Sequence, residues 1–63
     1  MPFIHVQLID GISEEKIETL IEKLTSAACE SIDVPPETIR VVITEVPNTH
    51  WGIAGKSAKK LGK

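Results

Sequence analysis

The segment VPPETIRVVITEV, residues 34–46, decides how this chain is expected to fold. Its two prolines disfavour helical geometry in the residues before them, so a helix that arrives from the N-terminal side should end within residues 33–36. The run IRVVITEV, residues 39–46, is rich in β-branched side chains and is typical of a strand. The segment therefore predicts a helix on its N-terminal side and a strand on its C-terminal side.

The residues upstream match this prediction. Ser13 can cap a helix whose first turn carries Glu14 and Glu15 beside its positive dipole end. Helical spacing then lays one apolar stripe along about five turns, formed by Ile17, Leu20, Ile21, Leu24, Ala27, Ala28 and Ser31 or Ile32. Residues 2–9 are apolar with a period of two, which predicts a strand covered on both faces, and Asp10-Gly11 then turns the chain.

Strand, long helix and strand make one βαβ unit, in which the crossover is right-handed and the two strands are parallel. The glycines of HWGIAGK, residues 50–56, favour a tight hairpin or a bulge over another helix. We therefore predict an α+β fold, a βαβ unit with a C-terminal β-hairpin, as a single domain over residues 1–63.

A chain of 63 residues is marginal alone, because a domain of this size buries only about 60% of its unfolded surface. The single Cys29 rules out an intramolecular disulfide. One helix can cover only one face of a two-stranded sheet, which leaves Phe3, Ile9 and Val42 exposed on the other. These observations predict an oligomer in which a second subunit covers that face.

The charge is uneven along the sequence. All nine acidic residues lie at or before Glu45, whereas residues 47–63 carry four lysines, although the formal net charge is −2. A pI of about 5.6 argues against nucleic acid or an anionic membrane as the main partner, and the lysines are interpreted as a solvated tail.

No apolar run could cross a bilayer, so a cytoplasmic location is expected. Neither CxxC nor HxxxH spacing is present, so no metal site is predicted.

Three residues are candidates for chemistry, each with a structural alternative. Removal of Met1 would make Pro2 a free secondary amine, and an α-amine titrates near neutral pH, where a general base works best; Pro2 could instead simply start a strand. Arg40 can grip a carboxylate or an enolate oxygen, or it can form a surface ion pair. Trp51 can line a ligand pocket or stabilise the fold by hydrophobic packing.

Taken together, Pro2 behind Met1, a length near sixty, VPPETIRVVITEV and THWGIAGK resemble the 4-oxalocrotonate tautomerase family. The resemblance implies that Pro2 moves a proton between the oxygen and carbon of an enol or dienol acid, which gives the unsaturated ketone without a cofactor. It implies that Arg40 reaches the substrate from a neighbouring subunit. It also implies that Trp51, in place of the usual phenylalanine, lines the pocket, and that the chain forms a homohexamer, a trimer of dimers.

One feature departs from that pattern, and two further points limit the expected chemistry. Ile12 stands where the best-known members carry a second arginine for a distal carboxylate, so a monoacid enol with an apolar tail is expected to be handled at least as well as 2-hydroxymuconate, unless a tail lysine such as Lys56 supplies the charge. Ile9 and Ile53 replace the arginine and glutamate of a dehalogenating branch, whose chemistry is not expected. A chain that keeps Met1 should be inert, and the alternative function is a catalytically silent oligomeric binding module.

Overall fold

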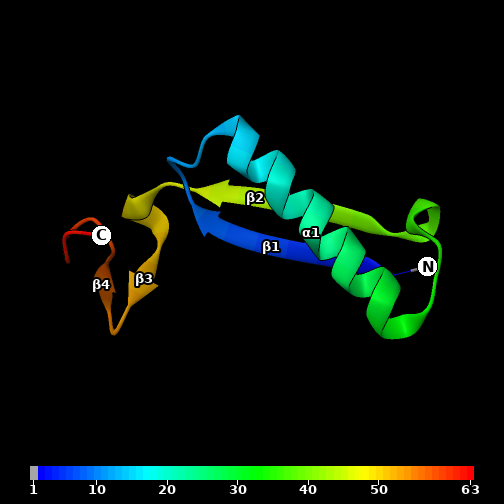
Figure 1. The fold of residues 1–63 in the computed structure, drawn as a ribbon. Coiled ribbons are helices and arrows are strands. Elements are labelled where there is room, and N and C mark those ends of the chain that lie inside the picture. The colour runs from blue at the N-terminus through cyan, green and yellow to red at the C-terminus, as the bar shows by residue number, and fades with distance from the viewer. Residues whose placement is uncertain (1) are drawn as a thin grey trace.

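Two parallel strands form the centre of the computed structural model, which describes residues 2–63 (Figure 1). Strand β1 (Phe3–Ile9) pairs with β2 (Arg40–Val46) in a register that runs from Phe3 opposite Arg40 to Ile9 opposite Val46. The Arg40 N–H donates to the Pro2 carbonyl at 3.1 Å and the Asp10 N–H donates to the Val46 carbonyl at 2.9 Å, so the pairing extends one residue past each end of β1. The predicted βαβ arrangement is confirmed.

Helix α1 (Glu14–Ile32) crosses one face of this pair (Figure 1). Ser13 caps it, since the Ser13 hydroxyl accepts the Lys16 N–H at 3.3 Å. The helix ends one residue before the range that the prolines predict. Asp33 adopts a left-handed conformation, with φ 57°, and its N–H donates to the Cys29 carbonyl at 3.0 Å. The prolines instead open a short 3₁₀ helix, η1 (Pro36–Thr38), before β2.

The covered side of α1 differs from the predicted stripe in its second half. Its half-buried residues are Ile17, Leu20, Ile21, Leu24, Thr25, Ala28 and Cys29. Ala27, Ser31 and Ile32, which the spacing placed on the stripe, are exposed. Steps of four residues from Ile21 lead to Thr25 and Cys29, so the half-buried side follows this row in the second half of the helix. The ribbon of α1 crosses the strand pair obliquely (Figure 1).

The C-terminal segment forms the predicted hairpin at the far end of the sheet. After η2 (Asn48–His50), β3 (Gly52–Ile53) pairs with β4 (Lys56–Ser57) in antiparallel fashion. Ala54 and Gly55 form its two-residue turn with φ of 52° and 85°, the positive values that a type I′ turn requires. The Asn48 side chain donates to the Lys63 main-chain oxygen at 3.0 Å, which holds the tail against η2.

One face of the β1–β2 pair lies bare in the single chain. We call it the open face; its residues alternate with those under α1 and are all exposed: Phe3, His5, Gln7, Arg40, Val42 and Thr44. His5 Nε2 and Thr44 Oγ1 form a hydrogen bond across it at 2.7 Å. The sequence predicted β1 to be covered on both faces, and the chain by itself covers one. Phe3 and Val42 are exposed as expected, whereas Ile9, which was expected to be exposed with them, is half-buried.

The chain buries little and is extended. Within residues 2–63, only Ile39, 7% exposed, and Ala58, fully buried, are shielded from solvent as core residues. The chain exposes 4780 Å², whereas a compact monomer of 6.9 kDa is expected to expose about 4,000 Å². Its radius of gyration is 14.5 Å, against about 11 Å expected for a compact chain of this length. The missing burial is what an oligomer can supply.

The long helix is amphipathic, with acidic residues in its first turn and an exposed outer side. No helix in the described part of the chain is long and apolar enough to span a membrane. The cytoplasmic location stays a prediction.

Candidate functional site

Pro2 and Arg40 lie together at the edge of the sheet where both strands begin. The Arg40 N–H donates to the Pro2 carbonyl at 3.1 Å, so the main chains of the two residues are directly joined. Pro2 is half-buried, whereas Arg40 is exposed on the open face beside Phe3. The predicted removal of Met1 concerns a residue outside the described range. We call this edge the proline end.

The Arg40 side chain is held by the backbone of the turn that precedes β2. Its Nη1 donates to the Glu37 carbonyl at 2.7 Å and to the Ile39 carbonyl at 3.2 Å. Both acceptors are neutral, so these bonds orient the guanidinium without cancelling its charge. A guanidinium has five N–H donors in a fixed fork, and those on its other nitrogens can still bind an anion in bidentate fashion.

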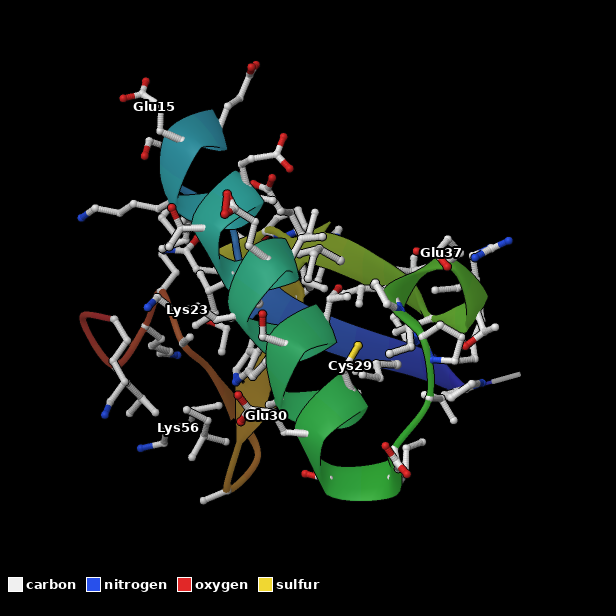
Figure 2. All side chains as sticks on the ribbon, turned by 45° about the vertical axis from the view of Figure 1, so that its right-hand side comes forward. Glu15, Lys23, Cys29, Glu30, Glu37 and Lys56 are labelled. Carbon is white, nitrogen blue, oxygen red and sulfur yellow. The ribbon has the colours of Figure 1, made fainter. Side chains whose placement is uncertain are left out.

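Trp51 lies at the opposite end of the molecule. It follows the C-terminal end of β2, and a strand of seven residues spans about 23 Å, so the length of the sheet separates Trp51 from the proline end. Figure 2 shows the same separation between Glu37, in η1, and Lys56, in β4. The sequence predicted Pro2, Arg40 and Trp51 as parts of one site, and a single chain does not bring them together.

Ile12 also lies beyond the C-terminal edge of the sheet, in the connection between β1 and α1. Its side chain is 43% exposed, and Ile53 in β3 is also exposed. We call Ile12, Trp51 and Ile53 the tryptophan end. Its described residues include two exposed aliphatic side chains and an indole, and the nearby hairpin and tail carry the four lysines of residues 47–63. The tryptophan end thus offers apolar contacts, with Lys56 opposite Ile53 in the hairpin and the other lysines of residues 47–63 on the tail.

A complete binding site is not present on one chain. No pocket forms on residues 2–63, whereas small-molecule sites usually bury most of their ligand in a concave surface. The same residues hold no group of three or more histidine, cysteine, aspartate or glutamate side chains arranged to bind a metal ion. Contact between the proline end of one copy and the tryptophan end of another is the arrangement that would bring all four candidates together.

Sequence reasoning missed the contribution of η1 to this site. The turn presents the Glu37 carbonyl to Arg40, and Thr38 closes the turn by donating its hydroxyl to the Pro35 carbonyl at 2.8 Å. The signal in the sequence was PPET, since proline favours the first turn of a helix and threonine hydroxyls often bond to nearby backbone in turns.

Comparison with known proteins gives consistent matches over nearly the whole chain. The family profile described as "Tautomerase enzyme" matches residues 2–61. The chain is 46% identical to the 2-hydroxymuconate tautomerase of Comamonas testosteroni over 63 residues, the full length of both.

Solved structures show the same fold. A structure from the study of 4-oxalocrotonate tautomerase isozymes of Methylibium petroleiphilum aligns with a TM-score of 0.95 at 47% identity, over 98% of this chain and all of that one. A heterohexameric 4-oxalocrotonate tautomerase of Chloroflexus aurantiacus J-10-fl aligns with a TM-score of 0.93 at 36% identity, over 97% of this chain and 98% of that one. The likeness therefore includes both ends of the sheet and the hairpin.

Proposed function

This chain belongs to the tautomerase family and is an isomerase, and from that premise we propose that Pro2, freed by removal of Met1, is the acid–base that interconverts the enol and keto forms of a 2-hydroxydienoate or a related enol acid. The observation that carries the proposal is the 3.1 Å bond from the Arg40 N–H to the Pro2 carbonyl. It joins the main chain of the one residue that can become a free cyclic amine to that of the only arginine in the sequence, so each subunit edge carries both residues, and the family resemblance implies that the guanidinium acts on the substrate of a neighbouring subunit.

The proposed reaction conserves all atoms. The Pro2 nitrogen removes the proton from the enol hydroxyl, the oxygen becomes the ketone, and the proton returns to a carbon of the conjugated chain. The Arg40 guanidinium binds the carboxylate and stabilises the negative charge that develops on the adjacent oxygen. The 2-hydroxymuconate tautomerase of Comamonas testosteroni supports a 2-hydroxydienoate as the substrate.

Trp51 and Ile12 complete the proposed pocket from a neighbouring copy. Both lie at the tryptophan end, about 23 Å from the proline end of their own chain, so their contribution to a Pro2 site requires a second subunit. In that position the indole of Trp51 packs against the substrate and excludes water, and Ile12 faces the end of the substrate far from Arg40.

The test separates an enzyme from a silent binding module on the same scaffold. A sample whose intact mass shows Met1 removed is mixed with 2-hydroxymuconate, and ketonisation is followed by ultraviolet absorbance. A rate well above the uncatalysed one supports the proposal. A processed, folded and assembled chain that leaves the ketonisation rates of both 2-hydroxymuconate and the enol of phenylpyruvate unchanged would identify the silent module.

We propose a homohexamer, a trimer of dimers, as the assembled state. The bare open face, the excess exposed surface and the separation of the two ends all support assembly, and the Chloroflexus aurantiacus relative is a heterohexamer. Val42, 41% exposed at the middle of the open face, tests it.

We expect Val42→Glu to dissociate the assembly, because it buries an unpaired carboxylate in the interface. Sedimentation velocity at micromolar concentration measures the change. The matched control is Ala27→Glu, which puts the same charge on the exposed side of α1 and should leave the sedimentation coefficient unchanged. A parent chain that sediments as a stable folded monomer would contradict the assembly.

The identity of residue 12 is expected to set the preference for the distal end of the substrate. A charge-assisted hydrogen bond contributes about 1.5–3 kcal/mol, so an arginine there should favour a dicarboxylate by roughly 10- to 100-fold. The parent should therefore use the enol of phenylpyruvate at least as well as 2-hydroxymuconate in kcat/KM, and Ile12→Arg should raise kcat/KM for 2-hydroxymuconate selectively.

Two variants control this comparison. Ile12→Met keeps an apolar side chain of similar size and should behave as the parent. Lys56→Ala tests whether the exposed lysine beside Ile53 holds the distal carboxylate instead. A strong preference of the parent for the dicarboxylate that Ile12→Arg leaves unchanged would show that residue 12 does not face that carboxylate.

A further inference from the structure

The 3₁₀ turn η1 is closed by one side chain. Thr38 donates twice to the Pro35 carbonyl, from its hydroxyl at 2.8 Å and from its N–H at 3.1 Å, and the Ile39 N–H donates to the Pro36 carbonyl at 3.1 Å. Hydrogen bonds in 3₁₀ turns have poorer geometry than those in α-helices, and this turn has only three residues. The Thr38 hydroxyl is therefore a large part of what fixes its shape.

The closed turn aims a carbonyl at the Arg40 guanidinium. Glu37, between Pro36 and Thr38, accepts a hydrogen bond from Arg40 Nη1 at 2.7 Å, which is shorter than the 3.2 Å bond from the same nitrogen to the Ile39 carbonyl. Arg40 is exposed and its side chain is long, so without these bonds it would populate many rotamers. A guanidinium fixed before the substrate binds loses less conformational entropy on binding.

We propose that Thr38 is a positioning residue for Arg40, which it orients through the Glu37 carbonyl without touching the substrate. This rests on the proposed function, in which Arg40 binds the substrate carboxylate. A threonine with only a structural role would affect folding or assembly, whereas a positioning residue affects substrate binding through Arg40 alone.

The primary test is Thr38→Val, which keeps the β-branched shape and removes the hydroxyl. The loss of one such bond should lower kcat/KM for 2-hydroxymuconate about fivefold, mainly through a higher KM. Thr38→Ser restores the hydroxyl and should recover the parent value. The matched control is Thr25→Val, because Thr25 is also half-buried and donates its hydroxyl to a carbonyl, that of Ile21, at 2.8 Å. It should leave KM unchanged.

Thr38→Ala gives a second test if Thr38→Val fails to assemble, as judged by circular dichroism and sedimentation. A double-mutant cycle with Arg40→Ala then isolates the pathway. In the Arg40→Ala background the Thr38 substitution that assembles, Thr38→Val or Thr38→Ala, should have no further effect on kcat/KM, because the side chain that Thr38 orients is gone.

The outcomes distinguish failure of the proposed role of Thr38 from failure of the proposed function on which it rests. The role of Thr38 would be overturned if the effects of the two substitutions on kcat/KM were fully additive. It would also be overturned if the Thr38→Val enzyme had the parent KM while the Arg40→Ala enzyme was impaired. Both outcomes leave the proposed function standing. An Arg40→Ala enzyme as active as the parent would overturn the proposed role of Arg40, and the role of Thr38 with it.

Discussion

A chain that keeps Met1 is expected to ketonise 2-hydroxymuconate about 10²- to 10⁴-fold more slowly than the same chain without it, which is the range that general acid–base catalysis spans. With Met1 attached, the Pro2 nitrogen is part of an amide, whose lone pair is delocalised and cannot take a proton near neutral pH. A chain of 63 residues can be made by chemical synthesis, so residues 1–63 and 2–63 can be compared with no substitution.

Two measurements accompany that comparison. Sedimentation of both forms checks that assembly is the same, since the bond from the Arg40 N–H to the Pro2 carbonyl does not involve the nitrogen that changes. The Pro2→Ala chain, also synthesised without Met1, replaces the secondary amine of proline with a primary amine at the same position, and its rate should fall between those of the two forms. Equal rates with and without Met1 would mean that another group is the base.

Replacement of Arg40 is the second large effect. Arg40→Ala should lower kcat/KM about 10²- to 10³-fold, because the loss of a donor to a developing oxyanion costs about that much in other enzymes. The main-chain bond to Pro2 survives the substitution, so the loss reports on the guanidinium. Steady-state kinetics with 2-hydroxymuconate measure it.

The comparison with lysine identifies what the guanidinium supplies. Arg40→Lys keeps the charge but loses the planar fork that matches a carboxylate and the geometry that fits the Glu37 and Ile39 carbonyls. It should recover only part of the activity lost in Arg40→Ala. Arg40→Ala kinetics within about threefold of the parent, a change of well under 1 kcal/mol, would remove Arg40 from the reaction.

Local patterns predicted the elements of this fold because they depend on neighbouring residues alone. The Ser13 cap, the hairpin and the period-two strands are all confirmed. The left-handed Asp33 was not predicted, because aspartate adopts that conformation only in particular contexts. The covered row through Thr25 and Cys29 depends on how α1 crosses the sheet, and sequence spacing does not determine that angle.

The candidate site was also predicted only where its residues follow from local patterns. Pro2 and Arg40 lie where the two predicted parallel strands begin, and in the structure their main chains are hydrogen-bonded, whereas the role of Arg40 in the site of a neighbouring subunit stays a prediction. By the same reasoning Trp51, which follows the second strand, belongs at the other edge, but the family resemblance grouped it with Pro2. The bond from Arg40 to the Glu37 carbonyl was not predicted, because PPET indicates a turn but does not determine which side chain its carbonyls face.

The scarcity of buried residues gives the proposed assembly a thermodynamic consequence. Only Ile39 and Ala58 are shielded from solvent among residues 2–63, so in the proposed hexamer contacts between copies supply much of the apolar burial that stabilises the fold. In that assembly folding and association are linked by mass action, so dilution should lower the melting temperature and no single unfolding free energy describes the chain. Stability differences between variants have meaning only when they are measured at one chain concentration.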